Sequence, residues 1–493
     1  MTAIDASEGT SARRRVFGWM MFDWASQPFF TLCLTFVFGP YFAVAAAEWF
    51  AAGGAAPEEA AANAQSAWSA GLALTGIAIA VTAPLLGALA DTGGRRMPWI
   101  VGFSVLYVIG TAGLWVMTPD GAAMWLALAF FGLAMIGVEY TTIFTNALLP
   151  SLGTPGEIGR ISGTGYALGY AGGVLSLAVM LLAFAENEAG VTLIGRPPPF
   201  GLDPDAREGT RLVGPFAALW FAVFMIPFFA YVREPRAPAP RASLGRAWAD
   251  LRTSLASVAR RRSLAAYLAG SMLYRDALAA LYGFGGTYAV LVLGWSVVQV
   301  GVFGILAAIT AGVASWIGGH LDMRHGPKPV IVACILALMA VSGVLAGMDR
   351  TAFFGVPLPE GSGLPDLTLY AMGCVIGGAG GVLQSASRSM MVRHATPERP
   401  TEAFGLYALS GKATAFLGPA LIGAATYLTV SPRMGFVPVI ALFALGLTLM
   451  RFVRPAGDVG APEAPVSGRR ALLLAALALG AMALLFLALG ALT

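Results

Sequence analysis

Charged residues are scarce in this sequence. Only 11% of its 493 residues are Asp, Glu, Lys or Arg, and 57% are hydrophobic. Water-soluble domains carry about a quarter of their residues as charges, so this composition excludes a soluble domain as the main body of the chain. It predicts an integral membrane protein.

Cysteine and histidine are also rare, with three residues of each. The cysteines all fall inside apolar stretches, where a thiol is a small packing residue rather than part of a disulfide framework or a metal site. They are Cys33, Cys334 and Cys374. The sequence carries no nucleophile elbow, no phosphate-binding loop and no nucleic-acid-binding motif. We therefore expect no enzyme activity, no cofactor, no metal and no nucleic-acid partner.

Long apolar runs fill most of the chain. About 20 apolar residues are needed to cross roughly 30 Å of hydrocarbon, and twelve runs reach that length in two sets of six. They are 16–45, 68–90, 98–117, 123–149, 161–184, 213–232, 263–293, 296–318, 329–348, 369–392, 403–429 and 435–454. We predict an N-terminal bundle (16–232), a basic linker (233–262) and a C-terminal bundle (263–454). A further apolar segment, 470–493, predicts an extra transmembrane helix.

The positive residues lie in alternate loops. Loops predicted to be inside hold 18 Lys or Arg residues, whereas the outer loops hold five. Because positive residues stay on the cytoplasmic side of short loops, we predict a cytoplasmic N-terminus, and an inner (plasma) membrane location if the source is bacterial. The linker contains eight arginines, and from Ser243 it predicts a basic amphipathic helix on anionic membrane lipid.

Two pairs of short motifs recur at equivalent places in the two sets of runs. "GALADTGGRR" at 87–96 follows the second run and "GGHLDMRHGPK" at 318–328 follows the eighth, with one residue more between Asp322 and Gly326 than the usual spacing. "YAL" occurs in the fifth run at Tyr166 and in the eleventh at Tyr407. The agreement in register predicts a 6+6 duplication of the kind found in transporters.

The motif at 87–96 resembles the signature of the major facilitator superfamily. Longer stretches, such as "MMFDWASQPFFTLCLTFVFGPYF" and "QSASRSMMVRHATPERPTEAFGLYALSGKATAFLGP", resemble the autophagy-related vacuolar amino-acid effluxers and their bacterial relatives, the "unknown major facilitators". The resemblance implies the all-α, 12-helix major facilitator fold of two six-helix bundles. It also implies a conformational gate at the inner signatures, formed by Gly87, Asp91, Arg95, Arg96, Asp322 and Lys328.

Six charges fall inside the predicted spans. A charge at the bilayer centre costs at least about 2.5 to 3.5 kcal/mol, so these residues must face protein or water. They are Asp23, Glu139, Arg275, Asp276, Arg388 and Lys412. Five of them lie on the first, fourth, seventh and tenth spans, which line the central cavity in the superfamily. Helical spacing places Gln27, Asn146 and Gln384 on the same faces as Asp23, Glu139 and Arg388.

The predicted substrate-binding or coupling residues are therefore Asp23, Gln27, Glu139, Asn146, Asp276, Gln384, Arg388 and Lys412. Asp276 matches the family pattern "YxD", whereas Arg275 does not belong to it. An arginine can hold a carboxylate in bidentate geometry and an acid can hold an ammonium group. The set thus predicts a small zwitterionic substrate. The alternative interpretation is that these charges form buried ion pairs without contact to a ligand.

We expect a monomeric secondary transporter that works by alternating access. The resemblance implies outward movement of amino acids, and proton coupling through Asp23 or Glu139 is expected because desolvation raises the pKa of a carboxylate. The sequence leaves open a lipid or lipid-linked solute flippase, or a non-transporting membrane sensor, on the same fold. A membrane-bound enzyme is disfavoured because no loop is large enough for a catalytic domain.

Overall fold

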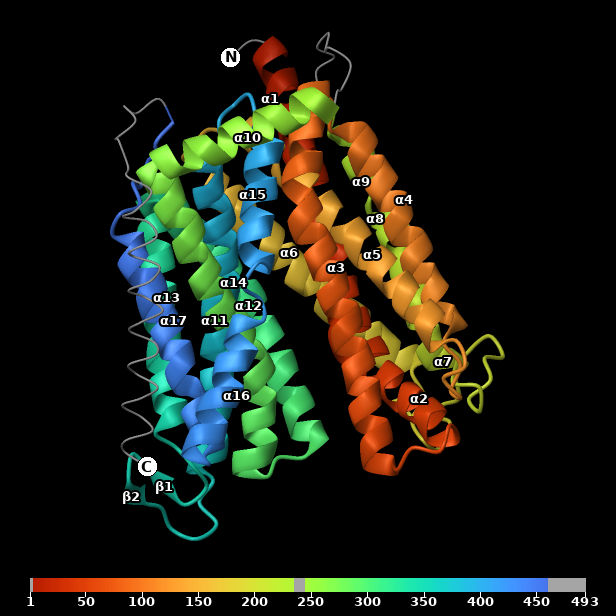
Figure 1. The fold of residues 1–493 in the computed structure, drawn as a ribbon. Helices are drawn as coiled ribbons and strands as arrows, with labels where there is room; N and C mark the ends of the chain where they lie inside the picture. Colours follow the sequence, from red (N-terminus) through yellow and green to blue (C-terminus); the bar gives the residue numbers. More distant parts are fainter. Residues whose placement is uncertain (1–2, 235–243, 460–493) are drawn as a thin grey trace. The chain divides into compact units, whose positions relative to one another are not determined.

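The computed structural model describes residues 3–234 and 244–459. These residues divide into two compact units, the first formed by 3–152 with 168–234 and the second by 153–167 with 244–459. Figure 1 shows the elements in sequence colours. The described residues are helical apart from loops and one two-stranded hairpin, as expected for an all-α membrane protein. The bundle boundaries predicted above stay a prediction.

The first unit contains helices α1 to α5, most of α6, and α7 to α9. Their bounds are α1 Ala3–Pro28, α2 Phe38–Ala52, α3 Pro57–Gly93, α4 Met97–Gly113, α5 Met124–Asn146, α6 Ile158–Val179, α7 Glu208–Arg211, α8 Val213–Phe224 and α9 Ile226–Tyr231. π-Helices occupy Phe29–Phe36 and Met180–Phe184, and short 3₁₀ turns occupy Leu114–Val116 and Leu149–Ser151. The N-terminal turns of α6, residues 158–167, belong to the second unit.

Prolines break the first membrane span at defined places. The π-helical segment begins directly after Pro28, which cannot donate a backbone hydrogen bond. Pro40 removes the bond to the carbonyl of Phe36, and Val37 between them leaves the helical region with φ −122°. The helices before and after Val37 together span Ser11–Ala52. The helices extend beyond the predicted runs 16–45 and 68–90, because α2 and α3 leave only residues 53–56 between them.

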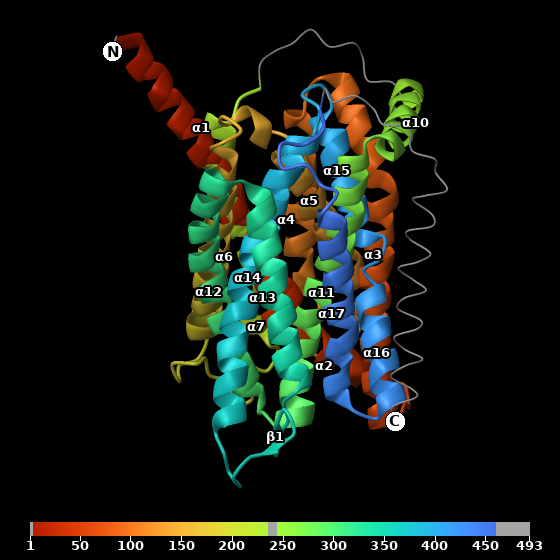
Figure 2. The same cartoon turned by 90° about the vertical axis from the view of Figure 1, so that its left-hand side faces the viewer.

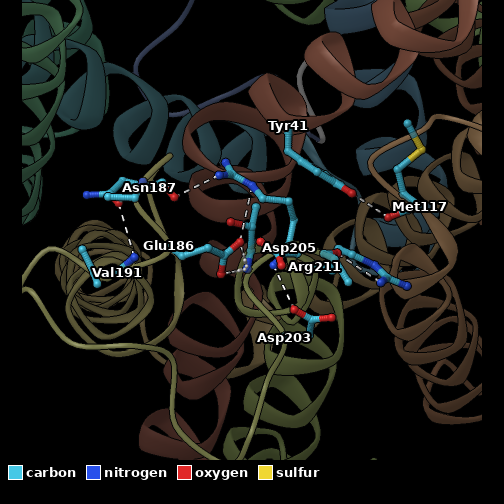
Figure 3. Close-up of polar contacts among 12 residues, drawn as sticks. Tyr41, Met117, Glu186, Asn187, Val191, Asp203, Asp205 and Arg211 are labelled. Atoms are coloured by element: carbon cyan, nitrogen blue, oxygen red, sulfur yellow. Dashed lines mark hydrogen bonds and ion pairs between the residues drawn. The ribbon is translucent and has the colours of Figure 1, made fainter. Parts of the chain in front are cut away.

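A polar cluster orders the long connection between α6 and α8 (Figure 3). Glu186 is buried, accepts from the Thr210 backbone N–H at 3.1 Å and pairs with Arg207 at 3.4 Å. Arg211 donates to the Trp115 carbonyl at 2.8 Å and lies over the Trp115 ring. Glu186 thus binds the N-terminal turn of α7, and Arg211 lies at its C-terminus, the charge arrangement that a helix dipole favours. The bonds of these two residues hold α7 against the rest of the first unit.

The second unit contains α10 to α17 and the hairpin. Their bounds are α10 Leu244–Arg260, α11 Arg262–Leu293, α12 Val297–His325, α13 Pro327–Ala346, β1 Ala352–Phe353, β2 Val356–Pro357, α14 Leu364–His394, α15 Pro400–Lys412, α16 Leu417–Thr429 and α17 Phe436–Met450, with a 3₁₀ turn at Pro432–Gly435 before α17. Within this unit α12 packs on α14, α13 lies between α14 and α17, and α17 packs along α11 (Figure 2). The antiparallel hairpin pairs Ala352 with Pro357 and Phe353 with Val356.

The predicted span 403–429 is interrupted in the structure. α15 ends at Lys412, residues 413–416 form turns, and α16 begins at Leu417. Pro419 explains the break, because it cannot bond to the carbonyl of Ala415 and its ring clashes with that carbonyl. The segment predicted as one span is therefore built from two helices joined by turns. Eleven helices among the described residues are long and apolar enough to cross a membrane, and the segment 470–493 lies outside the described residues.

Candidate functional site

The buried arginine of α14 is held by the N-terminal turns of α6. Arg388 is 3% exposed, its Nε donates to the Ser162 hydroxyl at 2.9 Å, and one Nη donates to the Ser162 carbonyl oxygen at 2.8 Å. Its guanidinium lies 4.4 Å from the centre of the Tyr166 ring, within cation–π range. These contacts fix the orientation of a buried guanidinium, the group that binds carboxylates in bidentate geometry.

A second arginine of this unit packs in the same way. The Arg275 guanidinium on α11 lies 4.3 Å from the centre of the Tyr407 ring and donates to the Tyr407 carbonyl at 3.1 Å. A Cβ added at Gly411 would lie 2.5 Å from this guanidinium, so a side chain at position 411 would displace the guanidinium from its present place. Tyr166 and Tyr407 are the first residues of the two "YAL" motifs, so each copy of the repeat places an arginine on a tyrosine face.

Asp276 lies at the interruption between α15 and α16. It is 3% exposed, and its carboxylate accepts a hydrogen bond from the hydroxyl of Thr414. Lys412 is the last residue of α15, and Gln384 lies one turn before Arg388 on α14. An interrupted helix beside a buried carboxylate is the arrangement that transporters use to present polar groups at mid-membrane depth.

The other predicted site residues lie in the first unit. Asp23 and Gln27 are on α1, which packs closely on α6: a Cβ added at Gly169 would lie 3.5 Å from the Asp23 Cβ, and one at Gly173 would lie 2.9 Å from the Gln27 Cγ. Glu139 is half-buried within α5, and Asn146, the last residue of α5, is buried. That these residues and those of the second unit form one site stays a prediction.

The first inner signature forms a charge cluster that closes the turn between α3 and α4. The Asp91 carboxylate binds the Arg96 guanidinium at 3.0 Å, and Glu234 accepts from the backbone N–H groups of Arg96 and Met97 at 2.7 and 2.8 Å. Glu234, after α9, thus caps the N-terminus of α4. Sequence reasoning missed it, because an acid after a span is typical of any loop. Of the remaining gate residues here, Gly87 is buried in α3 and Arg95 is exposed.

The second inner signature brings Asp322 to the start of α6. Asp322 is 1% exposed, and a Cβ added at Gly159 would lie 2.4 Å from its Cγ, so glycine is needed for this approach. Lys328 donates to the Val453 carbonyl at 2.8 Å.

The extra residue of the second signature changes how its helix ends. The Gly326 backbone N–H donates to the carbonyl four residues back, whereas the Gly94 N–H donates to the carbonyl three residues back. Both helices end at a glycine with positive φ, but only Gly94 adopts the left-handed helical conformation, because ψ is 9° at Gly94 and 165° at Gly326.

Solved structures of similar fold are transporters. The Escherichia coli fucose:proton symporter FucP aligns with a TM-score of 0.61 and 15% identity, over 89% of this chain and 98% of that one. A bacterial homologue of the iron transporter ferroportin aligns with a TM-score of 0.60 and 15% identity, over 90% of this chain and 98% of that one. The fold is therefore that of a major facilitator superfamily transporter, as the resemblance implied.

Sequence relatives narrow the class. A family model described as "Vacuole effluxer Atg22 like" matches residues 154–456, and the chain belongs to that family. The uncharacterised MFS-type transporter YxiO of Bacillus subtilis (strain 168) is 24% identical over 88% of this chain and 94% of its own length. Autophagy-related protein 22 of Coccidioides immitis is 27% identical over 59% of this chain, a match that spans about half of the fungal protein. The chain is a multi-pass membrane transporter and not an enzyme.

Proposed function

We propose that this transporter moves a small zwitterionic, amino-acid-like solute out of the compartment in which its N-terminus lies, by alternating access. Buried Arg388 carries the proposal, because its guanidinium is held in one orientation by Ser162 and Tyr166 and its planar fork suits a carboxylate. Asp276, beside the interrupted helix, offers an acid for an ammonium group. The family description "Vacuole effluxer" supports efflux of a solute from a compartment.

The energy source and location belong to the same proposal. An ion gradient drives the transport, and Asp23 or Glu139 takes up and releases the coupled proton, since carboxylates within membrane spans are the groups that form proton relays in transporters. The distribution of Lys and Arg supports a cytoplasmic N-terminus and, for a bacterial source, the plasma membrane.

Ligand-dependent thermal stabilisation of the purified protein tests the substrate class. The panel contains amino acids, their amides and decarboxylated amines, short peptides, sugars and lysolipids. Because a ligand that binds only the folded protein raises the unfolding temperature, we expect amino acids to stabilise and their amides and amines to lose most of the effect. Stabilisation by lysolipids alone would favour the flippase, and stabilisation by sugars alone would contradict the proposal.

A further inference from the structure

We propose that α10 is an interfacial helix that binds an anionic lipid surface through an edge formed by Trp248, Arg252 and Leu255. A corner of one residue connects it to a membrane span: α10 ends at Arg260 and α11, a candidate span, begins at Arg262. In Figures 1 and 2, α10 lies across the axis of α11 rather than along it. A helix that turns aside where a span begins lies at the level of the headgroups.

The corner is fixed by an acid from the far end of the same unit. Asp458, which is 8% exposed, binds the Arg261 guanidinium with one carboxylate oxygen. Its other oxygen accepts from the Leu264 backbone N–H at 3.1 Å, and Arg261 also donates to the His394 carbonyl at 2.8 Å. These bonds hold the residue between α10 and α11, so the direction of α10 is set by the unit itself.

The faces of α10 divide its apolar residues into two groups. Ala247 and Leu251, four residues apart, are 0% and 6% exposed and lie on the buried side of the helix. Trp248 and Leu255, seven residues apart, share the adjacent side, and they are 62% and 48% exposed. Arg252 lies one turn beyond Trp248 and is exposed. The helix thus exposes an apolar edge, Trp248 and Leu255, with the cation Arg252 beside it.

Charge selects the occupant of this edge. α10 carries Arg246, Arg252 and Arg260, and its one acid is Asp250. Arginines beside an exposed tryptophan at the end of a span match the negative headgroups of a leaflet, with the aromatic ring at headgroup level. An acidic protein partner would meet the same cations, and the test below separates the two.

Photocrosslinking of the full chain in vesicles tests the lipid contact. p-Benzoylphenylalanine replaces Leu255 in one protein and Thr253, exposed on the opposite side of α10, in the control. The vesicles contain phosphatidylglycerol and phosphatidylcholine in equal amounts, and mass spectrometry identifies the adducts. We expect lipid adducts at position 255, enriched in phosphatidylglycerol by roughly fivefold for one basic residue near the surface, and few adducts at position 253.

A matched pair of arginine variants tests the charge. Arg252→Gln in the position-255 protein should reduce the phosphatidylglycerol enrichment, whereas Arg246→Gln, the same change of charge on the side away from the edge, should preserve it. Absence of lipid adducts at position 255 would overturn the proposal, as would crosslinks to protein at that position. Adducts that mirror the vesicle composition would overturn the preference for anionic lipid.

Discussion

At the scale of single residues, three membrane charges of the second unit contact neutral groups. Arg388 meets Ser162 and Tyr166, Arg275 meets Tyr407, and Asp276 meets Thr414. The charges could be identified in the sequence because charged residues inside a membrane span are costly and therefore rare. Their neutral partners could not, since Ser, Thr and Tyr are common in membrane helices and their contacts depend on how the helices pack.

Thr414 provides the residue-scale prediction. Thr414→Val keeps the shape of the side chain and removes the hydroxyl that donates to Asp276, whereas Thr414→Ser keeps the hydroxyl. A hydrogen bond to a charged group contributes about 1.5 to 3 kcal/mol, so ligand affinity should fall roughly ten- to a hundredfold in the valine variant. Thermal-shift titration measures it, with the serine variant as the control. Equal affinities in both variants would show that this bond does not support binding.

At the scale of the elements, turn chemistry explains which helix ends could be predicted. The span predicted at 263–293 ends at Leu293 as the structure has it, because Gly294 adopts positive φ. The interruption at 413–416 was missed because the residues around it keep an apolar pattern, and a single proline such as Pro419 is common in membrane helices that continue past it. Hydropathy reports how long a run is, and it does not report backbone bonds lost within it.

The hairpin loop after α13 provides an element-scale prediction on pH. Burial alone would raise the pKa of the Asp349 carboxyl, but hydrogen bonds from Thr351 and Ala352 outweigh it and, with Arg433, hold the pKa below its usual value. The carboxylate therefore stabilises the fold above about pH 4, and this stabilisation is lost as the pH falls through the lowered pKa of the folded state.

Asp349→Asn should accordingly lower the thermal unfolding midpoint of the purified protein at pH 7, and the difference from the wild type should narrow as the pH falls toward 3. Glu360→Gln, an exposed acid in the same loop, serves as the control and should leave the midpoint unchanged at both values. A difference between Asp349→Asn and the wild type that persists at low pH would assign the effect to packing rather than to charge.

At the scale of the whole molecule, the duplication was the most informative feature of the sequence. Both inner signatures end their helices on positive-φ glycines, and both "YAL" tyrosines carry an arginine. The fold and family could therefore be predicted from repeated motifs. The substrate could not, because a binding site in this fold depends on how side chains from many helices converge, and substrate identity rests on distances that no repeat encodes.

The central claim is that Arg388 holds the carboxylate of a transported amino acid. Transport of the stabilising amino acid into reconstituted vesicles tests it most directly, with the wild type, Arg388→Ala and Arg388→Lys compared. The control is Arg160→Ala, which removes an exposed arginine from α6, the helix that also carries Ser162. Because lysine cannot reproduce bidentate binding, we predict that the alanine variant loses transport, the lysine variant retains little, and the control is unaffected, with all four proteins folded. Wild-type transport and affinity in a folded Arg388→Ala protein would contradict the account and leave Arg388 as a structural contact of α6.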